Sequence, residues 1–268
     1  MENFLAFFAH ARRKKPIIGL AQEGETLILS YVDQHKTAHY AQLTTHANST
    51  ALCPFDGLTT PLKTCTIVST LPVDHIWYKA IIMPTSTPAT RHQQVLHILH
   101  ENLPIPVSRL NFDYHITPLQ HIGTRRQIDC IEMIACQREH IHQLRQQCHP
   151  LPLSAVDYLP FALLRAFIFC LHELASNTLC VYIQDNFCCL LYPQPAQLHH
   201  LYHHTIESAV NIWHQRHREN PIDHLVLYCP QHLTFTNPFQ VAEIRIDPVQ
   251  YPHFLALGCA LWQGGNHA

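Results

Sequence analysis

Histidines gather between residues 198 and 217 at spacings that could bind a metal ion. Apolar positions across this range lie at helical spacing: Leu198, Tyr202, Ile206, Ala209 and Trp213. On such a helix, His199/His203 and His200/His204 are pairs four residues apart, and Glu207 lies four residues after His203. No HExxH motif occurs, and no third ligand is fixed by spacing. Because the chain has 24 histidines, the sequence favours a solvated helical face and predicts no metal site.

A second candidate for chemistry is the stretch Thr178–Pro193, which predicts two short strands around Gln184-Asp185-Asn186. A hairpin turn between two lobes can hold a phosphate, because its backbone N–H groups donate to phosphate oxygens. Glycine permits the close approach that this requires. The stretch contains no glycine. Whether this hairpin still works as a phosphate loop is therefore a central question for function.

Other catalytic patterns are absent from the sequence. There is no GxSxG elbow, no GxxxxGK[ST] loop and no GxGxxG motif. Cys188-Cys189 lies in a predicted strand without a positioned base. Asp113, Asp129 and Glu132 also lie in predicted strands, where nothing in the sequence pairs them. We expect no catalytic residues and no enzyme activity.

Composition restricts the class of protein. The formal net charge is −2 over 268 residues, which argues against direct nucleic-acid binding by phosphate neutralisation. The 11 cysteines are odd in number, lie mostly in apolar runs and form no CxxC pair. They are interpreted as reduced, small buried hydrophobes in a cytoplasmic protein.

Two apolar segments bear on the membrane. Met1–Ala11 precedes the basic cluster Arg12–Lys15, the reverse of a secretory signal. Phe4–Lys15 is interpreted either as a short helix docked on the body or as a contact with an anionic membrane surface. Leu159–Leu174 is 16 residues long and carries charges, so a buried core helix and a soluble protein are expected.

Elsewhere the chain alternates predicted strands and helices. Further strands are predicted at 16–20, 26–31, 38–43, 64–69, 77–83, 110–116, 127–135, 224–229 and 239–246, and helices near 88–103, 137–148 and 251–262. The plan is α/β in two lobes, each starting with a hairpin, with a small α+β segment inserted in the first.

Short motifs in this order resemble the PilM-like family of type IV pilus and competence proteins, the ComA and HofM type, within the actin-like ATPase superfamily. The resemblance spans nearly the whole chain. It rests on Ile17-Ile18-Gly19-Leu20, Pro72 and Pro84 around a strand, Leu103-Pro104-Ile105-Pro106, Phe112-Asp113-Tyr114, Ile134-Ala135-Cys136-Gln137, Pro152–Asp157 and Ala256-Leu257-Gly258-Cys259-Ala260-Leu261.

The resemblance implies a two-lobed actin-like ATPase fold. We expect a first lobe from residues 1–72 and 151–176, an inserted α+β subdomain at 73–150 and a second lobe at 177–268. It also implies a cytoplasmic adaptor on the inner membrane of a pilus or DNA-uptake machine. Its partner would be a PilN-like membrane protein, bound through a short cytoplasmic tail and also the source of peripheral membrane association.

PilM proteins bind ATP between their lobes, and the resemblance locates three loops for it. In the first loop, Leu20-Ala21-Gln22 replaces the Asp-x-Gly pattern, and Glu23-Gly24 follows it. In the second loop, Tyr182-Ile183-Gln184 replaces the same pattern. In the third loop, Cys229-Pro230 replaces a pair of glycines. We therefore expect a degenerate nucleotide site, no cofactor and no cofactor-binding residues. The alternative is a divergent ATPase that binds ATP–Mg²⁺ with Glu23, Gln184 and Asp185 as substitutes.

Overall fold

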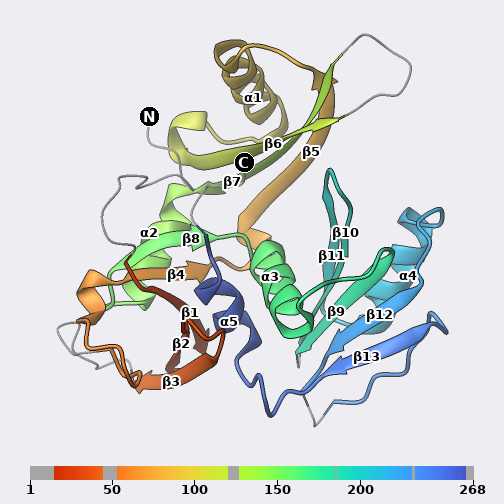
Figure 1. The fold of residues 1–268 in the computed structure, drawn as a ribbon. Coiled ribbons are helices and arrows are strands. Elements are labelled where there is room, and N and C mark those ends of the chain that lie inside the picture. Colours follow the sequence, from red (N-terminus) through yellow and green to blue (C-terminus); the bar gives the residue numbers. More distant parts are fainter. Residues whose placement is uncertain (1–14, 45–52, 120–126, 185, 231–232, 264–268) are drawn as a thin grey trace.

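A computed structural model gives the structure of the chain and describes residues 15–44, 53–119, 127–184, 186–230 and 233–263. Three sheets build the molecule: two of five strands that lie side by side, and one of three strands above them (Figure 1). In the described residues no helix is both long enough and apolar enough to cross a membrane. The N-terminal segment Phe4–Lys14 of the membrane-surface interpretation lies outside the described residues.

The first sheet has the strand order β3-β2-β1-β4-β8. Its strands are β1 (Ile17–Glu23), β2 (Thr26–Val32), β3 (Ala38–Thr44), β4 (Thr66–Thr70) and β8 (Leu153–Asp157). β1, β2 and β3 form an antiparallel meander, whereas β4 and β8 add in parallel. The short 3₁₀ helix η1 (Leu62–Thr64) precedes β4. The central parts of β1 and β2 are buried on both faces, which explains their continuous apolar runs.

The second sheet repeats this plan in the order β11-β10-β9-β12-β13. Its strands are β9 (Thr178–Gln184), β10 (Phe187–Pro193), β11 (Leu198–His203), β12 (His224–Tyr228) and β13 (Ala242–Ile246). β9, β10 and β11 are antiparallel, and β12 and β13 follow in parallel. Helix α4 (Ile206–Arg216) buries Ala209 and Trp213 against one face. Two lobes with the same strand order are thus present.

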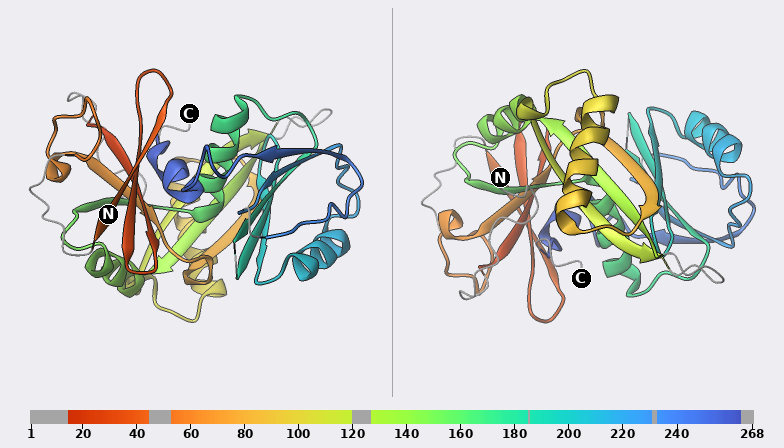
Figure 2. Two further views of the ribbon diagram at one scale, coloured as in Figure 1. Left: turned by 90° about the horizontal axis from the view of Figure 1, so that it is seen from below. Right: turned by 90° about the horizontal axis from the view of Figure 1, so that it is seen from above.

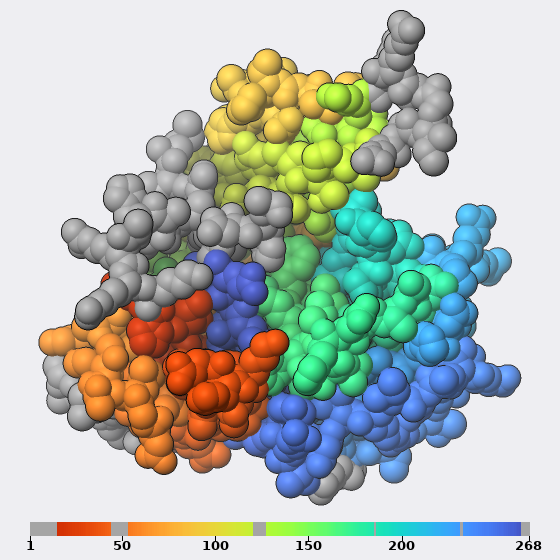
Figure 3. All heavy atoms as spheres, in the orientation of Figure 1, coloured from red at the N-terminus to blue at the C-terminus, as the bar shows by residue number. Residues whose placement is uncertain are grey.

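The inserted segment forms a sheet of order β5-β7-β6 beneath one helix. Its elements are η2 (Val73–His75), β5 (Ile76–Pro84), α1 (Pro88–Asn102), η3 (Val107–Arg109), β6 (Leu110–Leu119) and β7 (Ile128–Gln137). Thr87 caps α1 by accepting the Thr90 N–H at 3.2 Å, and Pro88 starts the helix. Val95 and Leu99 of α1 are fully buried against Ile131 and Met133. Figure 3 shows this segment, in yellow and light green, above the two lobes.

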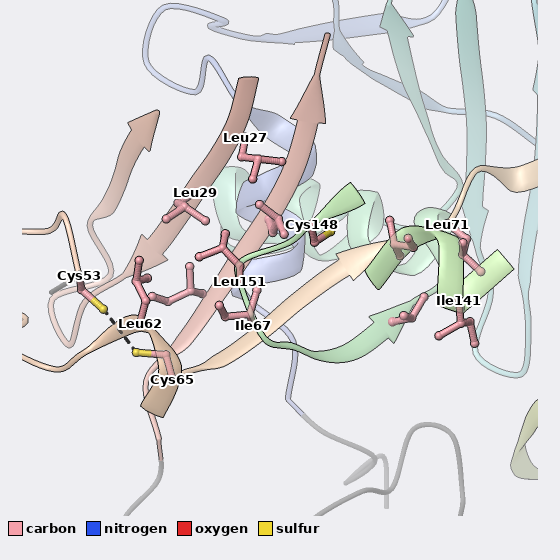
Figure 4. Packing of buried hydrophobic residues seen from close by; sticks show 14 of the residues in the cluster. Leu27, Leu29, Cys53, Leu62, Cys65, Ile67, Leu71, Ile141, Cys148 and Leu151 are labelled. Atoms are coloured by element: carbon pink, nitrogen blue, oxygen red, sulfur yellow. Dashed lines mark hydrogen bonds between the residues drawn. The ribbon is translucent and has the colours of Figure 1, made fainter. Parts of the chain in front are cut away.

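Helices α3 (Leu159–Leu171) and α5 (Phe254–Ala260) lie between the two large sheets (Figure 2). α5, although placed in the second lobe by the sequence analysis, packs on β1 and β2 of the first sheet. A third helix, α2 (Arg138–Gln147), was placed in the inserted segment. Its Ile141 and Leu144 lie in the core of the first sheet, part of which Figure 4 shows.

Two glycines set how closely these elements approach. A Cβ on Gly258 of α5 would lie 2.1 Å from the Ala162 carbonyl oxygen of α3. A Cβ on Gly19 of β1 would lie 1.9 Å from the Ala256 oxygen of α5. Arg165 of α3 secures the same contact, because its Nε donates to the Gly258 oxygen at 3.2 Å while its guanidinium pairs with Asp157. β1, α5 and α3 therefore approach at backbone contact, and the ion pair of Asp157 with Arg165 attaches β8 to α3.

The structure confirms the two-lobed α/β plan and the Thr178–Pro193 hairpin. The single helix predicted over 198–217 is wrong. Leu198–His203 is an edge strand paired with β10, and the helix begins only at Ile206 after Thr205. Pairing with a buried apolar strand outweighs the helical spacing of those apolar positions.

We expect Gly258→Ala to lower the free energy of unfolding by about 3 kcal/mol, because the added methyl group would overlap a main-chain oxygen. Urea unfolding monitored by circular dichroism measures this loss. The control is Gly24→Ala, where a Cβ meets open space and only the φ of +61° is unfavourable, at about 1 kcal/mol. A loss at Gly258 no greater than at Gly24 would contradict the close-contact interpretation.

Candidate functional site

The turn between β1 and β2, the turn between β9 and β10 and the end of β12 come together around one cleft of about 650 Å³. β9 and β12 are parallel neighbours, so their carboxyl ends meet at the same edge of the sheet. The cleft is lined by Gln22, Glu23, Gln184, Asn186, Phe187, Tyr228, Pro230, Pro248, Val249 and Pro252. The three loops that the sequence analysis connected with a nucleotide thus line a single site.

Two of the three residues considered as substitutes for an ATP–Mg²⁺ site lie in this cleft. Glu23 and Gln184 line the cleft together, and Pro230 lines it from the end of β12. Asp185 lies outside the described residues. Gly24, at φ +61°, forms the β1–β2 turn, and the Gln22 side-chain amide donates to its oxygen at 3.0 Å. Glycine suits this position because of the left-handed backbone conformation of the turn and not because of a lack of space, since a Cβ would meet nothing within 4 Å.

Negative charge dominates the ionisable groups of the cleft. Glu23 Oε1 lies 3.1 Å from Nδ1 of His253, and its carboxylate is 45% exposed. Burial raises the pKa of Tyr228, and the charge of Glu23 raises it further. The Tyr228 hydroxyl donates to the Tyr251 and Pro252 oxygens at 2.9 and 3.2 Å. No lysine or arginine is among the described residues that line the cleft.

Free backbone donors are scarce along one side of the cleft, at the end of β12 and around residues 248–252. Pro230, Pro248 and Pro252 have no N–H group. The Val249 N–H already donates to the Asp247 carboxylate at 2.8 Å. The remaining polar groups of the lining are largely side-chain amides, beside Phe187 and an exposed Val249. The cleft therefore offers a mixed apolar and amide surface with one acid.

Comparison with known proteins gives a match in structure alone. No family model and no curated protein matches the sequence. A chain in the structure of the PilM–PilN type IV pilus biogenesis complex aligns with a TM-score of 0.64 and 13% identity, over 93% of this chain and 98% of its own. The cytoplasmic domain of EpsL, an inner membrane component of the Vibrio cholerae type II secretion system, aligns with a TM-score of 0.53 and 10% identity. The alignment covers 92% of this chain and 95% of the EpsL chain.

A Bacteroides thetaiotaomicron protein of unknown function with an actin-like ATPase fold aligns more loosely, with a TM-score of 0.43 and 12% identity over 90% of this chain and 96% of its own. The near-complete alignment with the PilM–PilN complex chain and the repeated strand order decide the fold. The chain has a PilM-like fold.

Within this PilM-like fold, the histidines do not form the pairs that the sequence suggested. On strand β11, residues four apart lie about 13 Å from each other, so His199 and His203 cannot share a metal ion. In the described part of the chain no group of three or more His, Cys, Asp or Glu side chains could hold a metal ion. The solvated-face interpretation is also wrong for His200, which is part-buried at a junction of three parts of the fold.

This junction consists of Tyr78, Glu132, Tyr158 and His200. The Tyr158 hydroxyl donates to Nε2 of His200 at 2.6 Å. The Tyr78 hydroxyl donates to Glu132 Oε1 at 2.6 Å, and that oxygen also accepts the N–H of Leu198 at 3.3 Å. The rings of Tyr78 and Tyr158 stack at 5.6 Å. Hydrogen bonds therefore tie the inserted sheet, the start of α3 and strand β11 together.

Burial determines the protonation of the histidine and tyrosine side chains at this junction. It lowers the pKa of His200 to about 4, so the ring is neutral at pH 7. Neutral His200 can accept from Tyr158 at Nε2 while Nδ1–H donates to the Leu198 oxygen at 3.2 Å. Burial also raises the pKa of Tyr78, and its hydrogen bond to Glu132 raises it further. Both tyrosines remain protonated donors.

Sequence reasoning missed this junction. Glu132 and Asp129 were described as unpaired in strand β7. In the structure Glu132 accepts two hydrogen bonds, and Asp129 pairs with Arg91 of α1 at 3.1 Å. The partners are 38 to 66 residues away in the chain, so no local spacing indicates them. The one available signal was a carboxylate within an apolar strand, which needs a partner when buried.

We expect stability to fall with acidification between about pH 6.5 and 4, because His200 binds a proton in the unfolded chain but not in the fold. The loss reaches about 3 kcal/mol from the pKa difference and does not grow below pH 4 through this group. The titratable neighbours of the ring are Tyr78, Tyr158 and His199, and Glu132 is hydrogen-bonded to Tyr78.

Urea unfolding of His200→Gln across this pH range tests the assignment, and the variant should show a flatter dependence. His100→Gln is the matched control, because that side chain is 75% exposed and should leave the dependence unchanged. Equal slopes for the wild type and His200→Gln would refute the role of His200.

Proposed function

We propose that this protein is a non-catalytic assembly adaptor of a type IV pilus or competence DNA-uptake machine, on the cytoplasmic face of the inner membrane. It binds the short cytoplasmic tail of a PilN-like membrane protein and associates with the membrane through that partner. The proposal includes no direct nucleic-acid contact. The PilM-like fold supports it, since the aligned chain belongs to a PilM–PilN complex and EpsL is an inner membrane component.

The observation that carries the non-catalytic part is the lining of the interlobe cleft. ATP brings about four negative charges, which need cations or many N–H donors in a site of low solvent access. The described lining offers a carboxylate, three prolines and side-chain amides. We propose that these residues do not fit ATP–Mg²⁺, and that the lobes serve as a scaffold.

Calorimetric titration with ATP–Mg²⁺ at up to about 1 mM tests this part. We expect heats equal to those of dilution, for the wild type and for Glu23→Gln. Gln184→Ala serves as a second cleft variant and should behave the same. Binding at micromolar concentration that is lost in either variant would favour the alternative, a divergent actin-like ATPase that uses Glu23 and Gln184.

Partner capture is tested with synthetic peptides that cover the cytoplasmic tails of single-span membrane proteins encoded beside this chain. One such tail should bind with a dissociation constant of about 1–10 µM by fluorescence anisotropy, and its scrambled version should not. We expect about 1 mM ATP–Mg²⁺ to leave this affinity unchanged. Failure of every tail would overturn the adaptor role without bearing on nucleotide binding.

A further inference from the structure

Two cysteine sulfurs lie against each other in the core of the first lobe. Sγ of Cys53 and Sγ of Cys65 are 3.4 Å apart, and Figure 4 shows the two side chains pointing toward one another. Both residues are buried, with 7% and 3% exposure. The other cysteines are free thiols as well.

The backbone holds the two residues as neighbours. The Cys53 N–H donates to the Thr60 oxygen at 3.1 Å, and the Cys65 N–H donates to the Leu62 oxygen at 3.1 Å. The residues thus lie at the two ends of a short closed loop, 12 positions apart in sequence. The next residue, Thr66, donates to the Pro16 oxygen at 2.8 Å at the start of the sheet. The sulfurs can join without movement of a distant element.

We propose that Cys53 and Cys65 are a redox-active thiol pair, which a small peroxide oxidises to an intramolecular disulfide. The Cys53 thiolate attacks one oxygen of hydrogen peroxide, the O–O bond breaks, and a sulfenic acid and hydroxide form. The Cys65 sulfur then displaces the sulfenic oxygen, which leaves as water. Overall, two thiols and one peroxide give one disulfide and two waters, with two electrons passing from sulfur to oxygen.

The hydrogen bond between the two sulfurs changes their pKa values in opposite directions. Burial raises the pKa of both thiols, to about 12 for Cys65. The contact with Cys65 lowers the pKa of Cys53, and the same contact raises that of Cys65. Cys53 is also the more exposed of the two, at 7% against 3%, so we assign it as the attacking sulfur and Cys65 as the resolving one. Because both groups are mostly protonated at pH 7, the reaction is slow compared with that of an exposed thiolate.

This inference goes beyond the adaptor role and does not depend on it. The pair lies in the core beside Leu62 and Ile67, whereas the cleft is lined by other residues. A disulfide would restrict the loop that leads into β4 and stabilise the first lobe. It leaves the groups that line the interlobe cleft unchanged.

The experiment treats the full chain with about 1 mM hydrogen peroxide for about an hour, followed by alkylation and tryptic mass spectrometry. Trypsin separates the pair, since it yields the peptides Thr37–Lys63 and Thr64–Lys79, each with a single cysteine. We expect these two peptides to appear linked, with the loss of two hydrogens. The midpoint of thermal unfolding should rise by about 5 °C, and dithiothreitol should reverse both changes.

Cys53→Ala and Cys65→Ala should abolish the linked peptide and the thermal shift. Matched controls are Cys170→Ala and Cys229→Ala, at residues that are only partly buried, and these substitutions should leave the linked peptide and the thermal shift unchanged. Measurement on the unsubstituted chain decides the matter even if a core variant folds poorly. Oxidation confined to Cys170 and Cys229, or Cys53 oxidised without a link to Cys65, would overturn the proposal.

Discussion

The contact on which the structure depends is the main-chain approach of β1, α5 and α3. Gly19 lies against the Ala256 oxygen, and Gly258 lies against Ala162. A methyl group at either position would separate the elements. Arg165, held by Asp157, donates to the Gly258 oxygen across the same contact. Because α5 follows β13 of the second sheet and packs on the first sheet, this contact joins the two lobes and fixes their spacing.

That spacing creates the interlobe cleft, and the loop residues decide its chemistry. Both hairpin turns and the end of β12 line the cleft, because the two lobes repeat the same strand order and face each other with the same loops. Its lining combines proline, aromatic and amide groups with one carboxylate. The same scaffold with glycines and N–H donors there would suit an anion, so the difference lies in a few turn residues and not in the fold.

The junction around His200 adds a second connection, far from the first in sequence. Tyr78 and Glu132 come from the inserted sheet, Tyr158 from the start of α3, and His200 from edge strand β11. Buried hydrogen bonds of this kind are directional, and removal of one partner lowers the stability of the fold because the other partner is left unsatisfied. The inserted sheet is thereby held in a defined orientation relative to the second lobe.

The sequence by itself determined most strands, the buried helix that begins at Leu159, the hairpin Thr178–Pro193 and the two-lobed plan, because apolar periodicity and turn residues are local properties. The resemblance to the PilM-like family located Glu23, Gln184 and Pro230 in three loops of one site. Tertiary structure alone decided that Leu198–His203 is a strand, since pairing with β10 outweighs helical spacing. It likewise decided the partners of Glu132 and His200 and the contact of Cys53 with Cys65. Such contacts depend on the orientation of separate elements, which no local pattern of residues encodes.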